Sequence, residues 1–249
     1  MDKKVGLVDQ INLESKFLER EVTVSIYLPK DYTDLYKHHV IITFDGRDFF
    51  QFGQIHRTYE KLRSANQIDK AIIVGVHYES VEERRKEFHP DGSHRKEMSK
   101  FVVKELCPYI DKTFSTLKVG NARILLGDSL AASIALLTGL EYPHHFSQLG
   151  LFSPMINDTV TEKFKACSSL GLLNIKHYIG KEENHFKLIS GNYADFLTPN
   201  RAFSELLQKY NITYEYRELE GGHTWKTWKP HLEDMLSYFL SHQKQKSLI

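Results

Sequence analysis

Short apolar runs alternate with amphipathic stretches along most of this chain. Segment 21–28 (EVTVSIYL) alternates polar and apolar residues, a pattern typical of a strand with one buried face. Segments 39–44 (HVIITF) and 71–76 (AIIVGV) are continuously apolar and rich in β-branched residues, which is typical of strands buried on both faces. Further strands are predicted at 122–126, 148–152, 175–179 and 212–219.

The segments between these strands carry helical patterns. Helices are predicted at 55–66, 99–114, 130–140, 201–210 and 230–242, on the basis of apolar spacing and N-cap residues. Strands that alternate with helices predict an α/β fold, a doubly wound and mostly parallel sheet with helices on both faces. Functional residues are then expected at the carboxyl ends of the strands. The length of 249 residues is compatible with a single domain over 1–249.

Composition narrows the classes of partner. The chain has 33 Lys and Arg against 32 Asp and Glu, so no global field favours nucleic acid or an acidic membrane. Charged residues interrupt the apolar start of the chain, and no run of about 18 apolar residues occurs. We therefore expect a cytoplasmic protein. Two isolated cysteines predict reduced thiols, and no pattern predicts a metal or cofactor.

Ser129 is the candidate nucleophile. Segment 122–133 (ARILLGDSLAAS) places it between a buried strand and an apolar helix, as a nucleophile elbow requires. Gly127 and Ala131, two residues before and after, are small enough for strand and helix to approach closely, although alanine replaces the second glycine of the usual motif. The alternative role for Ser129 is a simple helix N-cap.

The letters GDSL also suggest the GDSL-type lipases. In that family the serine follows the first strand, and Asp-x-x-His lies near the C-terminus. Here the serine comes after about half of the chain, and Glu220 stands three residues before His223. We therefore reject this family.

His223 is the candidate general base among 13 histidines. It follows the predicted strand 212–219 in a Gly-Gly-His turn, and two glycines leave the loop free to project the imidazole over the sheet edge. The order serine, acid, histidine is also that of α/β-hydrolases.

The acid that orients the imidazole is expected in segment 180–185 (GKEENH), after the strand at 175–179. Both Glu182 and Glu183 are available, and the spacing from Gly180 favours Glu183. Asp195 and Glu220 are weaker alternatives, and a Ser-His dyad without an acid stays open.

An oxyanion hole needs backbone N–H donors, each contributing about 3 kcal/mol to lowering the barrier. One candidate donor is the N–H of Leu130, next to the nucleophile. The other is the N–H of Arg47 in the loop FDGRDFF after the strand at 39–44. The alternative for Asp45-Gly46 is an ordinary turn.

With these residues assembled, the chain resembles the putative esterase family of α/β-hydrolases, which includes esterase D-like enzymes, enterochelin and bacillibactin esterases and a group of acyltransferases. The motifs that carry the resemblance run from VTVSIYLPKDY through TFDGRDFF, RRKEFHP, KELCPYIDKTFS and ILLGDSLAASIALLTGLEYPHHFSQLGLFSP to GGHTWKTW. The resemblance implies the same nucleophile, base and oxyanion donors, with Glu183 as acid. The FSP and His-x-Trp motifs look especially like those of siderophore esterases.

The expected reaction is two-step acyl transfer from a small-molecule ester through an acyl-enzyme to water. The substrate is either a trilactone siderophore or a generic small ester. Basic residues near the predicted site mouth would suit an anionic siderophore; they are Arg47, Arg57, Arg84, Arg85 and Arg95. Two other classes remain open, an acyltransferase and a catalytically silent binding module.

Overall fold

Eight strands form one sheet in the order β1-β2-β4-β3-β5-β6-β7-β10 in the computed structural model, which describes residues 3–187, 191 and 193–241. β2 pairs antiparallel with β1 and β4, and all other neighbouring pairs are parallel. The predicted mostly parallel α/β sheet is confirmed. Its strands are β1 (Val8–Ser15), β2 (Arg20–Tyr27), β3 (His39–Thr43), β4 (Ala71–Val76), β5 (Arg123–Asp128), β6 (Gln148–Phe152), β7 (Asn174–Gly180) and β10 (Thr213–Leu219).

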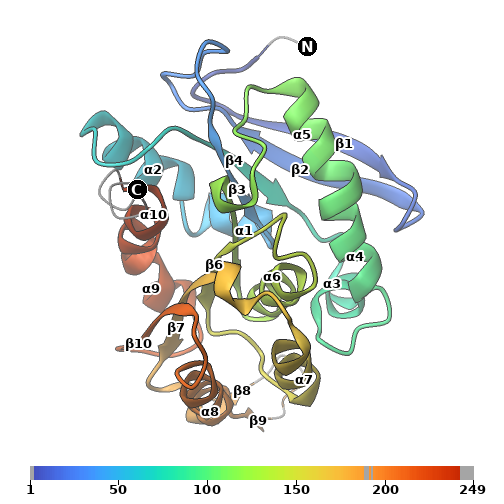
Figure 1. Ribbon diagram of the computed structural model, residues 1–249, viewed down its shortest axis with the longest axis vertical. Coiled ribbons are helices and arrows are strands. Elements are labelled where there is room, and N and C mark those ends of the chain that lie inside the picture. Colours follow the sequence, from blue (N-terminus) through green and yellow to red (C-terminus); the bar gives the residue numbers. More distant parts are fainter. Residues whose placement is uncertain (1–2, 188–190, 192, 242–249) are drawn as a thin grey trace.

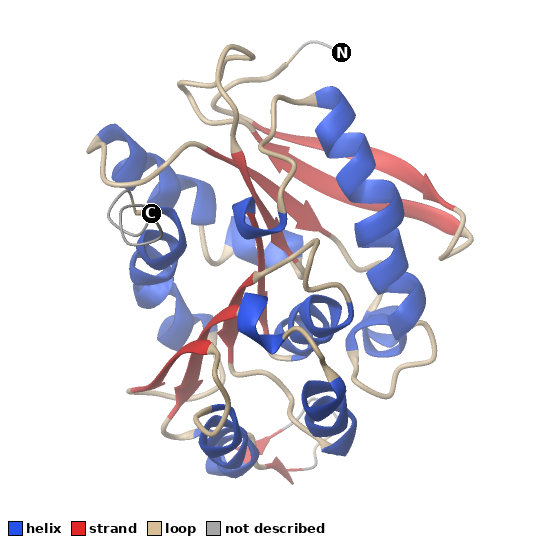
Figure 2. Cartoon of the chain, in the orientation of Figure 1, coloured by secondary structure: helices blue, strands red, loops and turns tan. Residues whose placement is uncertain are grey.

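Helices cover both faces of the sheet (Figures 1 and 2). One face packs against α1 (Gly46–Gln51), α2 (Ile55–Ser64), α9 (Trp225–Trp228) and α10 (Leu232–Leu240). The other packs against α3 (Val81–Phe88), α4 (Arg95–Phe101), α5 (Cys107–Thr113), α6 (Leu130–Glu141), α7 (Asp158–Ala166) and α8 (Leu197–Leu207). β3, β4 and β5 are buried almost throughout, because helices exclude water from both of their faces. In the described part of the chain, no helix has the length and apolarity needed to cross a bilayer.

The helix predicted at 99–114 is longer than expected and irregular. It begins at Arg95 as α4 and passes through a π-helical segment, Val102–Leu106, into α5. Pro108 accounts for the irregularity, since proline has no N–H for the carbonyl of Lys104 and its ring clashes with that carbonyl. Arg95 is buried and pairs with Glu141 at the end of α6, which anchors the beginning of this long helix.

Several elements had no clear signal in the sequence. β1 is an edge strand with only partial burial, α1 has six residues, and α3 (VEERRKEF) is mostly charged. α7, α9 and the small hairpin β8 (Phe186–Lys187) and β9 (Tyr193–Ala194) were also not predicted. The helix predicted at 230–242 begins as a 3₁₀ turn at Lys229–His231 and continues as α10; residue 242 lies outside the described residues.

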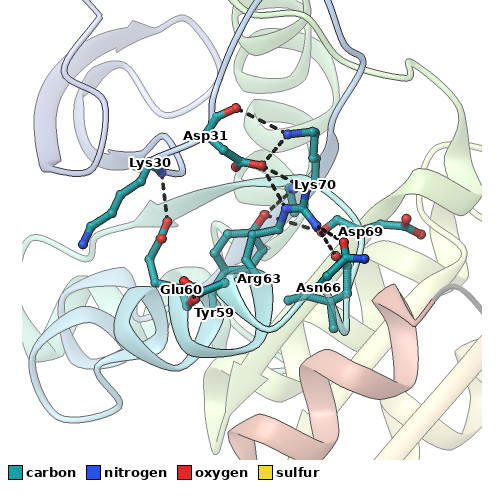
Figure 3. A network of polar contacts seen from close by, with 11 residues as sticks. Lys30, Asp31, Tyr59, Glu60, Arg63, Asn66, Asp69 and Lys70 are labelled. Atoms are coloured by element: carbon teal, nitrogen blue, oxygen red, sulfur yellow. Dashed lines mark hydrogen bonds and ion pairs between the residues drawn. The ribbon is translucent and has the colours of Figure 1, made fainter.

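A polar network ties α2 to the sheet at the edge where the parallel strands begin (Figure 3). Asp31, after β2, accepts hydrogen bonds from the Arg63 guanidinium at 2.9 and 3.1 Å and from the Lys70 ammonium. Glu60 accepts from the backbone N–H of Lys30 at 2.9 Å and from the Tyr27 hydroxyl at 2.8 Å. These contacts lie at the end of the sheet opposite the one where β3, β5 and β7 end.

Candidate active site

Ser129 lies in a sharp turn between β5 and α6. Its backbone has φ 54° and ψ −126°, a conformation that costs a non-glycine residue on the order of 1–3 kcal/mol. A Cβ on Gly127 would lie only 2.1 Å from the carbonyl oxygen of Ala131, so this position requires glycine. Ala131 is itself fully buried and fits where the usual motif has glycine. The strand-turn-helix predicted around Ser129 is therefore present, with the serine at the carboxyl end of β5.

The imidazole of His223 meets Ser129. Its Nε2 lies 2.8 Å from the Ser129 Oγ, and its side chain is only 7% exposed. The turn after β10 makes this possible, because Gly221 adopts φ +113° and its carbonyl accepts the N–H of Glu182 at 3.0 Å. The rings of Phe186, Phe196 and Trp228 surround the imidazole at centroid distances of 4.7, 4.4 and 5.0 Å.

Glu183 is the acid that the structure brings to His223. Its Oε2 lies 2.7 Å from the His223 Nδ1, and the residue is fully buried. With Nδ1–H donating to Glu183, the neutral imidazole presents Nε2 as the acceptor for the Ser129 hydroxyl.

The other candidate acids lie elsewhere. Glu182 is exposed, Glu220 pairs with Lys181 on the surface, and Asp195 accepts the N–H of Thr198 at the start of α8.

Two residues that the sequence analysis did not single out complete the support of the acid. The Ser153 hydroxyl donates to Glu183 Oε1 at 2.6 Å, and the indole N–H of Trp228 donates to Ser153 Oγ at 3.0 Å. The N–H of Gly180 adds a 2.9 Å hydrogen bond to the same carboxylate oxygen. These donors compensate for the loss of water around a buried carboxylate. Ser153 lies in the FSP motif and Trp228 is the last residue of the GGHTWKTW segment, and these two segments were the available signal.

The predicted oxyanion donors lie at the first turns of two helices. Arg47 is the second residue of α1, and Leu130 is the first of α6, positions whose N–H groups have no acceptor within the helix. Gly46 packs directly on Gly75 of β4, where a Cβ would lie 2.3 Å from a backbone carbon. This close approach fixes the loop that precedes Arg47.

The five arginines predicted near the site mouth have different surroundings. Arg84 pairs with Asp45 and Arg95 with Glu141, so both guanidinium groups are engaged within the protein. Arg47, Arg57 and Arg85 are exposed. Arg47 lines a surface depression of about 290 Å³ together with Arg20, Thr23, His77 and Tyr78.

Comparison with known proteins gives a family and a fold. The chain matches the family model described as putative esterase over residues 15–239. It is 39% identical over 240 residues to the uncharacterized protein YjcH of Bacillus subtilis strain 168, which covers 96% of this chain and 100% of that protein.

Solved structures of other proteins share this fold. The chain is similar to the enterobactin esterase FES from Shigella flexneri, with a TM-score of 0.81 and 20% identity over 95% of this chain and 60% of that one. The chain thus spans about 60% of the length of FES. It is also similar to the BES protein from Bacillus cereus, with a TM-score of 0.74 and 23% identity over 96% of this chain and 97% of that one. A ferulic acid esterase has a TM-score of 0.75 and 18% identity over 94% of this chain and 97% of that one.

The hydrogen bond from Ser153 to Glu183 predicts that Ser153 contributes to both activity and stability. We expect Ser153→Ala to lower kcat for a p-nitrophenyl ester about 10-fold, and stability by about 1–3 kcal/mol, because Glu183 loses a donor and the Trp228 N–H loses its acceptor. Ser64→Ala, which removes an exposed hydroxyl at the end of α2, is the matched control and should leave kcat unchanged. Equal kcat values for all three proteins would contradict the prediction.

Asp48 predicts a pH-dependent stability. Burial, followed by the nearby Asp45 carboxylate, raises the pKa of Asp48 from 3.8 to about 6. Because the folded state binds this proton more tightly than the unfolded chain does, ionised Asp48 destabilises the fold above pH 6. We expect Asp48→Asn to increase the free energy of unfolding by about 1 kcal/mol at pH 8, a value reduced for solvent screening, and by much less at pH 4. Urea denaturation at both pH values measures the difference; a gain of equal size at both would contradict the assignment.

Proposed function

The chain belongs to the putative esterase family and is thereby identified as a carboxylic-ester hydrolase, and we propose that Ser129 is its nucleophile, His223 its general base and Glu183 the orienting acid. One observation carries this proposal. The Ser129 hydroxyl, the His223 imidazole and the Glu183 carboxylate form a continuous line of hydrogen bonds of 2.8 and 2.7 Å. The three residues come from the ends of β5, β10 and β7, so the sheet holds them in this geometry.

In the first step, His223 Nε2 takes the hydroxyl proton as Ser129 Oγ attacks the ester carbonyl carbon. Glu183 stabilises the imidazolium through Nδ1–H. The tetrahedral intermediate then collapses, and the imidazolium gives its proton to the leaving alkoxide. In the second step, His223 activates water, which attacks the acyl-enzyme and releases the acid with Ser129 restored.

The backbone N–H groups of Arg47 and Leu130 are the proposed donors to the oxyanion. Their places at the first turns of α1 and α6, at the carboxyl ends of the adjacent strands β3 and β5, support this assignment. A donor of this kind interacts more strongly with the developing oxyanion than with the ground-state carbonyl, so it lowers the barrier rather than KM.

Replacement of the nucleophile tests the mechanism. We expect Ser129→Ala to lower kcat for p-nitrophenyl acetate at least about 10³-fold and to abolish labelling by a fluorophosphonate probe, because the alanine has no attacking oxygen. Ser64→Ala should keep both the activity and the labelling. Full turnover by Ser129→Ala would show that another group carries the reaction, and a wild-type protein that is neither labelled nor active would favour a binding module.

For the substrate, we propose a cyclic trilactone siderophore. The similarity in fold to the enterobactin esterase FES supports this class. The exposed Arg47 guanidinium, which forms no ion pair within the described ranges 3–187, 191 and 193–241, supplies a cation beside the site for an ionised catecholate.

Substrate preference is measurable directly. We expect kcat/KM for a catecholate trilactone to exceed that for a simple acetyl ester by at least about 10-fold, equivalent to roughly 1.4 kcal/mol of differential transition-state binding. Arg47→Gln should reduce this preference, whereas Arg57→Gln, which removes an exposed arginine on α2, should not. Equal values of kcat/KM for the two esters would contradict the siderophore proposal and favour a generic small-ester hydrolase.

A further inference from the structure

A buried ion pair holds residues 44–47, the segment after β3 that carries the proposed donor Arg47 and that we call the oxyanion loop. Arg84, from α3, donates from Nε to both carboxylate oxygens of Asp45 at 2.8 and 2.9 Å, and from Nη2 to Asp45 Oδ2. Asp45 is 1% exposed, and the Arg84 side chain is 19% exposed. The guanidinium also lies over the rings of Tyr78 and Phe88 at 5.7 and 5.9 Å, which restricts its position. Two-point contacts of this kind fix orientation as well as distance.

Asp45 is the residue on which the oxyanion loop turns. Its backbone has φ 54°, in the left-handed region, and its carbonyl accepts the N–H groups of Asp48 and Phe49 at 2.9 and 3.1 Å. Such a conformation persists in a non-glycine residue only where the surroundings impose it. The contact between the side chain and Arg84 is one such constraint, and the direction of the Arg47 N–H, two residues later, depends on it.

A second buried carboxylate comes from the nucleophile elbow. Asp128, directly before Ser129, is 5% exposed, and its Oδ1 has no hydrogen-bond partner in the described part of the chain. Burial and the charge of Asp45 raise the pKa of Asp128 well above its ordinary value, while Arg84 opposes this shift. Asp45 makes the ion pair with Arg84, whereas Asp128 has no such partner to stabilise its charged form. Arg84 therefore contacts the carboxylate of the oxyanion loop and acts electrostatically on that of the elbow.

We propose that Arg84 is a positioning residue for ester hydrolysis, which through Asp45 fixes the backbone of the oxyanion loop relative to the Ser129 turn. The proposal rests on the function proposed above. Arg84 itself does not contact the substrate. It acts by keeping the Arg47 N–H directed at the position that the oxyanion occupies, and by holding a positive charge against the Asp45 carboxylate, whose negative charge would otherwise oppose that of the oxyanion.

The test separates positioning from folding. We expect Arg84→Met to lower kcat about 10²-fold with less than about a threefold change in KM, because the oxyanion donors act mainly in the transition state. Arg84→Lys should lie between wild type and Arg84→Met, since lysine keeps the charge without the two-point geometry. The thermal unfolding of each variant is measured alongside kcat and KM, to show whether the variant is folded.

Arg95→Met is the matched control. Arg95 makes a comparable two-point ion pair with Glu141 at 2.9 and 3.1 Å, and is also buried. It should lose stability as Arg84→Met does, yet keep kcat within about a factor of two. Should Arg84→Met fail to fold, the double variant Asp45→Asn/Arg84→Met removes both charges together, and the same 10²-fold loss in kcat is expected of it.

The outcomes distinguish the role proposed for Arg84 from the catalytic mechanism proposed for Ser129, His223 and Glu183. Wild-type activity that is lost in Ser129→Ala, together with full kcat in a folded Arg84→Met or double variant, would overturn only the role of Arg84. An equal loss of kcat in Arg95→Met would also overturn it, since the effect would then be one of general destabilisation. Turnover that survives in Ser129→Ala would overturn the mechanism itself.

Discussion

The burial of the Glu183 carboxylate is the constraint on which the rest of the site depends. A fully buried carboxylate is tolerable only where hydrogen-bond donors replace water, and here they come from Gly180 at the end of β7, from Ser153 after β6 and from His223 after β10. Three neighbouring strand ends are thereby joined through one side chain. Trp228, at the end of α9, extends the network to the helices of one face.

The sheet explains why residues so distant in the chain meet. β3, β5, β6, β7 and β10 run parallel, so their carboxyl ends lie along one edge, and every segment discussed as part of the site follows one of these strands or adjacent β4. The antiparallel hairpin β1–β2 continues the sheet beside β4. Polar contacts among Asp31, Arg63 and Lys70 hold the opposite edge, where the parallel strands begin.

The sequence was most informative where a structural requirement dictates the residue types within a short segment. Buried strands rich in β-branched residues, the small residues around Ser129 and the paired glycines before His223 each have a local cause. They predicted the fold correctly, and they singled out two side chains that lie 2.8 Å apart in the structure. Glu183 was separable from Glu182 only by spacing. Ser153, Trp228 and the contact between Asp45 and Arg84 were not predictable in this way, because their interactions join residues 30, 75 and 39 positions apart.

The aromatic rings around His223 bear on how much entropy the imidazole would lose in each turnover. Phe186, Phe196 and Trp228 leave the imidazole little room to rotate, so its orientational entropy is lost once, when the chain folds, and not again in each turnover. The proposed proton transfer from Ser129 Oγ to His223 Nε2 would then need no search among ring orientations.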